Sequence, residues 1–175
     1  MVHSIELIPD ADIEAQLWRD WRLLAEAGLP SQLSVRSESN RPHVTVTVAS
    51  SFGAGVDAAL SEVFDLLPLP CVVGAPLLFG TSRFTVANLV VPSPQLLAFH
   101  AAVNRCCRPH APDGLLDHAE PGRWTPHLTL ARRVEPAQLA QVAPLIARRT
   151  ELAGQFTGLR HWNGNQRVEH WLVAP

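Results

Sequence analysis

Apolar and polar positions follow two successive series of extended and helical periods along the chain. The first series predicts three strands and two helices, in alternation: strand 4–9, helix 10–28, strand 42–49, helix 56–67 and strand 71–79. The second series predicts the same alternation: strand 84–91, helix 94–107, strand 125–131, helix 136–149 and strand 155–162. Both series therefore have the order strand, helix, strand, helix, strand.

Segments rich in Ser, Pro, Asn and Gly predict the long connections. Residues 29–41 are expected to form a loop with a ragged strand, and residues 108–122, with three prolines and two glycines, a second loop. Asn163-Gly164-Asn165 is a turn signal between strand 155–162 and a last strand at 167–173. The chain is therefore expected to end in a β-hairpin.

The two series also correspond residue by residue. Leu7-Ile8-Pro9 aligns with Val90-Val91-Pro92, the segment 42–46 aligns with 126–130, and Gly74 aligns with Gly158, at an offset of 83 to 84 residues. A constant offset of this size indicates an internal duplication. We therefore predict one bilobal α+β domain over 1–175, with pseudo-repeats at about 1–82 and 83–175 and antiparallel sheets flanking a central cleft.

The second strand of each series has one apolar face and one polar face, because side chains alternate along a strand. The polar sets are His43, Thr45 and Thr47 in one strand and Thr125, His127 and Thr129 in the other. Since the two strands are equivalent, they are expected to face each other across the cleft, with the polar faces toward a ligand.

Two histidines, each two residues before a threonine, suit phosphodiester hydrolysis. The reaction needs a base for the attacking oxygen and an acid for the leaving oxygen, and imidazole, with an ordinary pKa of about 6.5, can supply either. The hydroxyls of Thr45 and Thr129 can donate to the non-bridging phosphate oxygens. His43 and His127 are the expected catalytic pair, and nothing in this chemistry requires a metal or another cofactor.

Further substrate contacts are expected near these strands. Arg41 extends the face of His43 if that strand begins early, and Arg133 has the parity of the cleft face. Arg132 has the opposite parity unless a bulge reverses it. Phe84 and Trp124 could stack on a base, although core packing is favoured for both.

Composition restricts the expected class of substrate and the expected cellular compartment. The net charge is −2 and all 14 basic residues are arginine, so the chain lacks the basic field that attracts long nucleic acids. Three cysteines, two of them adjacent, do not form a disulfide framework and favour the cytoplasm. No stretch of the sequence has the length and hydrophobicity of a membrane span, and the N-terminus has no secretory pattern. We expect a monomer without an obligate protein partner, acting away from membranes on a small ribonucleotide or an RNA end.

The motifs Arg41-Pro42-His43-Val44-Thr45-Val46 and Trp124-Thr125-Pro126-His127-Leu128-Thr129-Leu130-Ala131-Arg132 resemble those of the 2H phosphoesterase superfamily. They are particularly similar to its 2′-5′ RNA ligase-like branch. The resemblance implies a bilobal fold with the motifs on central strands of the cleft. It also implies activity on 2′,3′-cyclic phosphates or 2′-5′ linkages, with ligation as the reverse reaction. By analogy with the family, His127 would activate water and His43 would protonate the leaving ribose oxygen.

Two alternatives remain at this stage. A metal-dependent hydrolase would use the histidines as ligands and needs a third ligand, for which Asp117, His118 and Glu120 are the clustered candidates. A non-catalytic nucleotide or phosphate sensor on the same fold is the second, because fold does not fix function. Chelator resistance separates the first alternative from a two-histidine enzyme, and turnover of a 2′,3′-cyclic mononucleotide separates the second.

Overall fold

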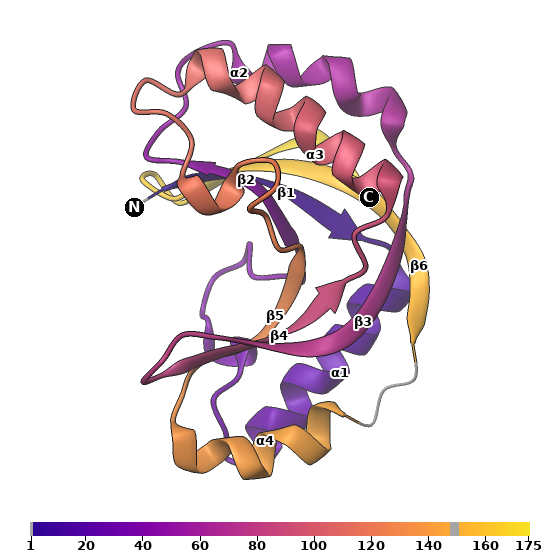
Figure 1. The fold of residues 1–175 in the computed structure, drawn as a ribbon, viewed down its shortest axis with the longest axis vertical. Coiled ribbons are helices and arrows are strands. Elements are labelled where there is room, and N and C mark those ends of the chain that lie inside the picture. Colours follow the sequence, from indigo (N-terminus) through magenta and orange to yellow (C-terminus); the bar gives the residue numbers. More distant parts are fainter. Residues whose placement is uncertain (1, 148–150) are drawn as a thin grey trace.

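The strands of the computed structural model, which describes residues 2–147 and 151–175, lie close to their predicted positions (Figure 1). The described residues form seven strands: β1 His3–Pro9, β2 Val44–Ala49, β3 Leu69–Phe79, β4 Phe84–Val90, β5 His127–Val134, β6 Leu152–Asn163 and β7 Val168–Val173. All the pairings are antiparallel, and β6 and β7 form the expected hairpin. The α+β class with antiparallel strands is confirmed.

The two longest helices begin at side-chain caps. The described residues hold four α-helices: α1 Ala11–Glu26, α2 Val56–Ala59, α3 Pro94–Cys107 and α4 Leu139–Ile146. The side chain of Asp10 accepts a hydrogen bond from the amide of Ile13 and caps α1, and Ser93 caps α3 through the amide of Leu96. Each cap satisfies a backbone donor that the first turn of a helix leaves open.

The other helical predictions are only partly right. The expected helix at 56–67 is α2 followed by a 3₁₀ helix at Leu60–Leu66, and the one at 136–149 is a 3₁₀ turn, Pro136–Gln138, followed by α4. Residues 148 and 149 of that prediction lie outside the described residues. The predicted loops contain further 3₁₀ turns, at Gln32–Ser34, Arg108–His110 and Asp117–Ala119.

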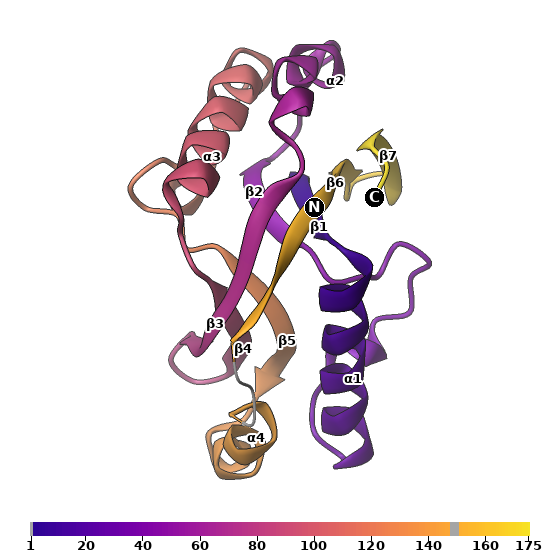
Figure 2. The same ribbon diagram turned by 90° about the vertical axis from the view of Figure 1, so that its right-hand side faces the viewer.

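The sheet has the strand order β2-β1-β6-β3-β4-β5, with β7 paired to β6. If β1, β2 and β3 are exchanged for β4, β5 and β6, the order of the six-strand path reads the same from its other end. The helices obey the same exchange, because α1 packs with α4 and α2 packs with α3 (Figures 1 and 2). The architecture thus has an approximate twofold symmetry, while the division into duplicated halves at about 1–82 and 83–175 stays a prediction.

The apolar strand faces form the core beneath the helices. Val44 and Val46 of β2 and Leu128 and Leu130 of β5 are fully buried, as the alternation predicted. Thr47 was expected on the polar face, but it is buried and its hydroxyl donates to the side chain of Asn104 on α3 at 2.9 Å. The polar faces that remain open are therefore short and lie around the two histidines.

The two histidine-bearing strands are the outer strands of the six-strand path, whereas the family resemblance implied central strands. Among the strands of residues 2–147 and 151–175, β2 pairs with β1 alone and β5 with β4 alone, and Ala49 of β2 also forms an isolated bridge with Leu115. The two strands nevertheless contact each other. A twisted sheet curls, so its two ends can approach on one side. Residues that lie 84 positions apart in sequence, such as His43 and His127, thereby come to one place.

Candidate active site

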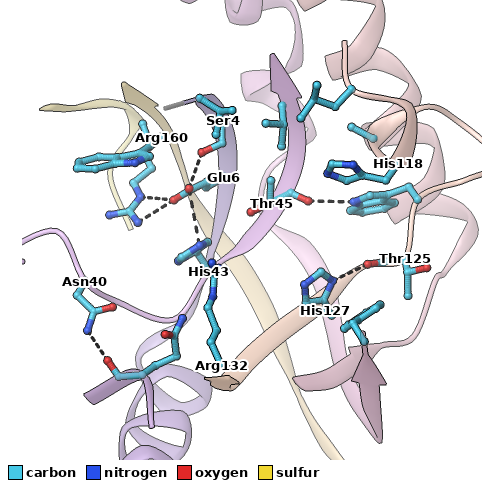
Figure 3. A pocket seen from close by; sticks show the side chains of 18 of the residues that line it. Ser4, Glu6, Asn40, His43, Thr45, His118, Thr125, His127, Arg132 and Arg160 are labelled. Atoms are coloured by element: carbon cyan, nitrogen blue, oxygen red, sulfur yellow. Dashed lines mark hydrogen bonds and ion pairs between the residues drawn. The ribbon is translucent and has the colours of Figure 1, made fainter. Parts of the chain in front are cut away.

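The two histidine rings are held in the same way. The Nδ1 atom of His43 lies 2.7 Å from the carbonyl oxygen of Arg41, and Nδ1 of His127 lies 2.7 Å from the carbonyl oxygen of Thr125 (Figure 3). A carbonyl oxygen only accepts hydrogen bonds, so each Nδ1 carries the proton. Each neutral ring therefore has its lone pair on Nε2. The backbone two residues upstream thus fixes both the tautomer and the orientation of each ring.

Both rings line one open cavity of about 720 Å³. Of the predicted site residues, His43, His127, Thr45 and Trp124 lie on its wall. The remaining wall comes from many parts of the chain: Val2, Ser4, Glu6, Gln32, Val35, Ser37, Ser39, Asn40, Val48, Phe79, Leu116, His118, Ala119, Arg123, Thr125, Arg132, Arg160 and Trp162. The cavity thus combines both halves of the fold and has the size of a small-molecule site.

His127 is half-buried at the start of β5. The ring of Phe79 packs against it, with centroids 4.7 Å apart. Burial lowers the pKa of His127 below its ordinary value, against the hydrogen bond to Thr125, which raises it, and the positive charges of His43 and Arg132 lower it further. These surroundings favour the neutral ring, which is the form a general base needs.

His43 faces a buried carboxylate. The Nε2 atom of His43 lies 3.7 Å from Oε1 of Glu6 on β1. Glu6 is 3% exposed and also binds Arg160, whose Nε and Nη2 atoms both lie 2.7 Å from Oε2, and Ser4, whose hydroxyl lies 2.6 Å from Oε1 (Figure 3). Burial alone would raise the pKa of Glu6, but the charges of His43 and Arg160 and these hydrogen bonds together lower it. Glu6 is therefore an anion at the wall of the cavity.

Trp124 is fixed at the wall of the cavity. Its indole N–H donates to the carbonyl oxygen of Thr45 at 2.9 Å, and its ring stacks on His100 with centroids 4.1 Å apart. His100 is buried and bonded to the carbonyl of Ala119 at 2.9 Å. Trp124 thus holds the backbone of the first motif in place and also forms part of the cavity wall.

Three predicted contacts lie away from the cavity wall. The guanidinium of Arg41 forms two hydrogen bonds to Glu14 on α1, at 2.7 and 3.2 Å, and lies over the ring of Trp171. Phe84 is half-buried and packs against the core, which is the alternative that was favoured for it. Thr129 is half-buried but is not among the residues that line the cavity. Of this group, Arg41 contributes to the site through its backbone carbonyl.

The structure also corrects the expected arginine on β5, because Arg132 lines the cavity and Arg133 does not. The pairing of β5 with β4 shifts between Val86 and Ala87, and again between Phe84 and Val86. Each shift inserts one extra residue into β5 and reverses the alternation of its side chains. Arg133 takes the strained left-handed conformation, with φ at 60°. A bulge therefore places the side chain of Arg132, and not that of Arg133, on the face of β5 that lines the cavity.

Sequence reasoning missed Glu6, Arg160, Phe79 and the placement of Arg132. Glu6 is the one Asp, Glu, Lys or Arg residue of β1, and Arg160 is the one of β6, a signal that the sequence did contain. They are paired directly across β1 and β6, although 154 residues separate them. Phe79, at the end of β3, carried no such signal.

Of the three residues proposed as further metal ligands, His118 lines the cavity, whereas Asp117 and Glu120 form ion pairs. Asp117 pairs with Arg123 at 3.2 Å, and Glu120 pairs with Arg108 at 2.6 Å. Within residues 2–147 and 151–175, no group of three or more His, Cys, Asp and Glu side chains is placed to hold a metal ion. The metal-dependent alternative thus gains no support from this arrangement. In the same part of the chain, none of the helices has the length and apolar character needed to cross a bilayer.

One family profile matches most of the chain, and several solved structures share its fold. The profile of the 2′-5′ RNA ligase superfamily matches residues 9–166. No curated protein sequence matches the chain significantly. The solved structure of the MHV ns2 PDE domain has 19% sequence identity and a TM-score of 0.54, covering 89% of this chain and 91% of that one. Kluyveromyces marxianus Usb1 with uridine monophosphate has 10% identity and a TM-score of 0.54, covering 99% and 98%. E. coli LigT with 3′-AMP has 16% identity and a TM-score of 0.50, covering 99% and 94%.

Proposed function

Because the chain belongs to the 2′-5′ RNA ligase superfamily of 2H phosphoesterases, we propose that it is a metal-independent phosphodiesterase acting through His43 and His127. Its substrates are 2′,3′-cyclic phosphates or 2′-5′ linkages of short ribonucleotides. One observation carries this proposal: both rings are held by Nδ1 at 2.7 Å from a carbonyl oxygen and line the same cavity. Acid–base catalysis needs two such groups on opposite sides of one phosphorus atom.

The reaction then proceeds as an in-line displacement. One neutral imidazole takes a proton from water as the water oxygen bonds to phosphorus. The other imidazole, protonated, gives its proton to the ribose oxygen as the bond from that oxygen to phosphorus breaks. After turnover the two rings have exchanged protonation states, and proton exchange with solvent resets them. If a ribose 5′-hydroxyl takes the place of water, the same proton transfers bond it to the phosphorus of a 2′,3′-cyclic phosphate while the 3′ oxygen leaves and is protonated, which is 2′-5′ ligation.

The phosphate is held by donors from both motif strands. The hydroxyl of Thr45 donates to a non-bridging oxygen, and Arg132 supplies a positive charge from β5. Thr45 and Arg132 line the cavity. Trp124 and Phe79 offer aromatic faces to a base.

A small substrate is favoured by size and charge. A cavity of about 720 Å³ is in the range of small-molecule sites, and a net charge of −2 offers little attraction to a long polyanion. Mononucleotides are bound by two proteins of similar fold, Usb1 with uridine monophosphate and LigT with 3′-AMP. These ligands have the chemistry of the products expected here.

Turnover of 2′,3′-cyclic mononucleotides and of a 2′-5′-linked dinucleotide, with and without a chelator, tests the proposal. We expect chelator-resistant hydrolysis of at least one of them. His43→Ala and His127→Ala should each lower kcat/KM by about 10² to 10⁴-fold. His170→Ala, which changes an exposed histidine of β7, is the matched control and should keep its activity. Binding without turnover would instead support a nucleotide sensor, and loss of activity with chelator would support a metal enzyme.

A further inference from the structure

The twofold arrangement of the site is broken by one charged residue. The two histidines have equivalent backbone anchors, so their anchors alone do not decide which is the acid and which the base. The alignment of Leu7-Ile8-Pro9 with Val90-Val91-Pro92 places Glu6 opposite Leu89. A carboxylate thus lies beside His43 at a position where the other half has an apolar side chain.

The carboxylate is held so that one oxygen remains available to His43. Arg160 binds Oε2 through two nitrogen atoms, each at 2.7 Å. Ser4 and His43 share Oε1, with the serine hydroxyl at 2.6 Å and Nε2 of His43 at 3.7 Å. Because Glu6 and Arg160 are each 3% exposed, water screens this arrangement little. The negative charge therefore acts on the reactive nitrogen of His43 at short range.

We propose that Glu6 is a positioning residue that keeps His43 in its imidazolium form, so that His43 is the general acid and His127 the base. This inference rests on the proposed phosphodiesterase function. An anion within about 4 to 6 Å favours the charged form of a base. The charge of His43 also contributes to lowering the pKa of Glu6.

The other charges near His43 come from several elements. Arg160 of β6 opposes Glu6, but Glu169 of β7 binds Nη1 of Arg160 at 2.7 Å and offsets part of its charge. His127 and Arg132 of β5 share the cavity with His43 and carry or acquire positive charge. The pair formed by Arg41 and Glu14 of α1 is internally compensated. Among the described residues that line the cavity, Glu6 is the only carboxylate.

The pH dependence of kcat/KM on a 2′,3′-cyclic mononucleotide is the direct test. A general acid must be protonated, so its titration sets the basic limb of the profile, while the general base sets the acidic limb. Glu6→Gln keeps the size of the side chain and removes its charge. We expect the basic limb to move to lower pH by about one unit, with the acidic limb unchanged. A purely structural role would lower activity equally at all pH values.

Two further variants keep the test decisive. Glu169→Gln removes a carboxylate from the same arginine without contact to His43 and should move the basic limb far less than Glu6→Gln does. Glu6→Gln/Arg160→Gln removes the arginine left without its partner, in case the single variant does not fold. It should move the basic limb in the same direction but by less, because a positive charge near His43 is removed too. An unmoved basic limb in both Glu6 variants, or a moved acidic limb, would overturn the inference.

A substrate with a sulfur leaving atom isolates the acid step. Sulfur departs without a proton, so the loss that Glu6→Gln causes at alkaline pH should disappear with this substrate. A loss of equal size with oxygen and sulfur would contradict the inference.

Nuclear magnetic resonance of the His43 ring separates this inference from the proposed function. The ring should lose its proton at lower pH in Glu6→Gln than in the unmodified protein, whether or not turnover occurs. Equal titration of His43 in the two proteins would overturn the role of Glu6. Absence of turnover in the unmodified protein would overturn the proposed function alone.

Discussion

The indole N–H of Trp124 donates to the carbonyl oxygen of Thr45 at 2.9 Å, joining the segment that leads into β5 to the strand β2. A second bond has the equivalent role, because the indole of Trp21 on α1 donates to the carbonyl of Thr129 at 3.0 Å. β2 and β5 each have one partner strand, so part of their backbone needs other hydrogen-bond partners. The two tryptophans supply them at the motif threonines.

Trp124→Phe should lower activity more than stability. The variant keeps an aromatic ring on His100 but removes the donor to Thr45, a loss of about 1 kcal/mol in unfolding free energy. Because small displacements of catalytic groups are costly, we expect kcat/KM to fall about tenfold or more. Chemical denaturation and steady-state kinetics measure the two effects.

Trp18→Phe, which removes an indole donor to Glu14 on α1, is the control and should leave kinetics unchanged. Equal kinetics in the two variants would show that the bond does not position the motif.

Local features of the fold were predictable because capping and periodicity are local. Helix α3 has the predicted bounds, since Ser93 and Pro94 define its start and an apolar stripe continues to Cys107. The segment 56–67 was less predictable, because i+3 and i+4 hydrogen bonds give similar apolar spacing over so few turns. The strand order was not readable at all, and with it the position of β2 and β5 at the ends of the six-strand path.

The histidines of the site were predictable and much of their surroundings was not. His43 and His127 stand out because the same motif recurs at equivalent positions. Glu6 and Arg160 become partners only through the register of β1 with β6, which no local pattern specifies. The exchange of Arg133 for Arg132 follows from bulges in β5, and a bulge requires knowledge of the partner strand.

Arg132 and Arg133 should differ in their effect on substrate binding. Arg132→Met removes a positive charge from the cavity wall, and we expect KM for a cyclic mononucleotide to rise about tenfold, from the loss of one charge-assisted contact of about 1.5 kcal/mol. Arg133→Met changes the neighbouring exposed side chain and should leave KM within about twofold. Steady-state kinetics at low salt tests the pair. A larger effect of Arg133→Met would mean that β5 has no bulge when substrate is bound, so that Arg133 and not Arg132 faces the cavity.

Thr45 and Thr129 should contribute unequally. Thr→Val keeps the shape and β preference of the side chain and removes the hydroxyl, so it isolates one hydrogen bond. Thr45 lines the cavity, and Thr45→Val should cost about 2 to 4 kcal/mol of transition-state stabilisation if its donor is aimed at developing charge. Thr129→Val should cost less, because Thr129 does not line the cavity. Single-turnover rates of the two variants decide this, and equal losses would require the strand β5 to move when substrate binds.

A buried chain of hydrogen bonds lies apart from the cavity, where β1 meets β6. Nδ1 of His3 lies 3.0 Å from Nε2 of His161, whose Nδ1 lies 2.8 Å from Oδ1 of Asp57. A carboxylate only accepts, so Nδ1 of His161 is the donor in that bond. Burial lowers the pKa of His3 below its ordinary value of 6.5, as does the positive charge of His161, whereas Asp57 acts in the opposite direction. A second proton on this chain is therefore disfavoured in the folded state.

The lowered pKa of His3 predicts acid sensitivity of the fold. Below pH 6.5 the unfolded chain binds a proton at His3 that the folded chain resists, so the unfolding free energy falls as pH falls. The stability is fully present above pH 6.5, and the loss is at most about 1.4 kcal/mol for each pH unit below it. His100 and His127, whose pKa values burial also lowers, act in the same direction.

His3→Gln cannot titrate, so denaturation between pH 8 and pH 5 should give a shallower fall of the unfolding free energy for this variant than for the unmodified protein. His110→Gln, at a histidine outside this chain of hydrogen bonds, should keep the original slope. Parallel curves for His3→Gln and the unmodified protein would show that His3 takes up its proton equally in both states.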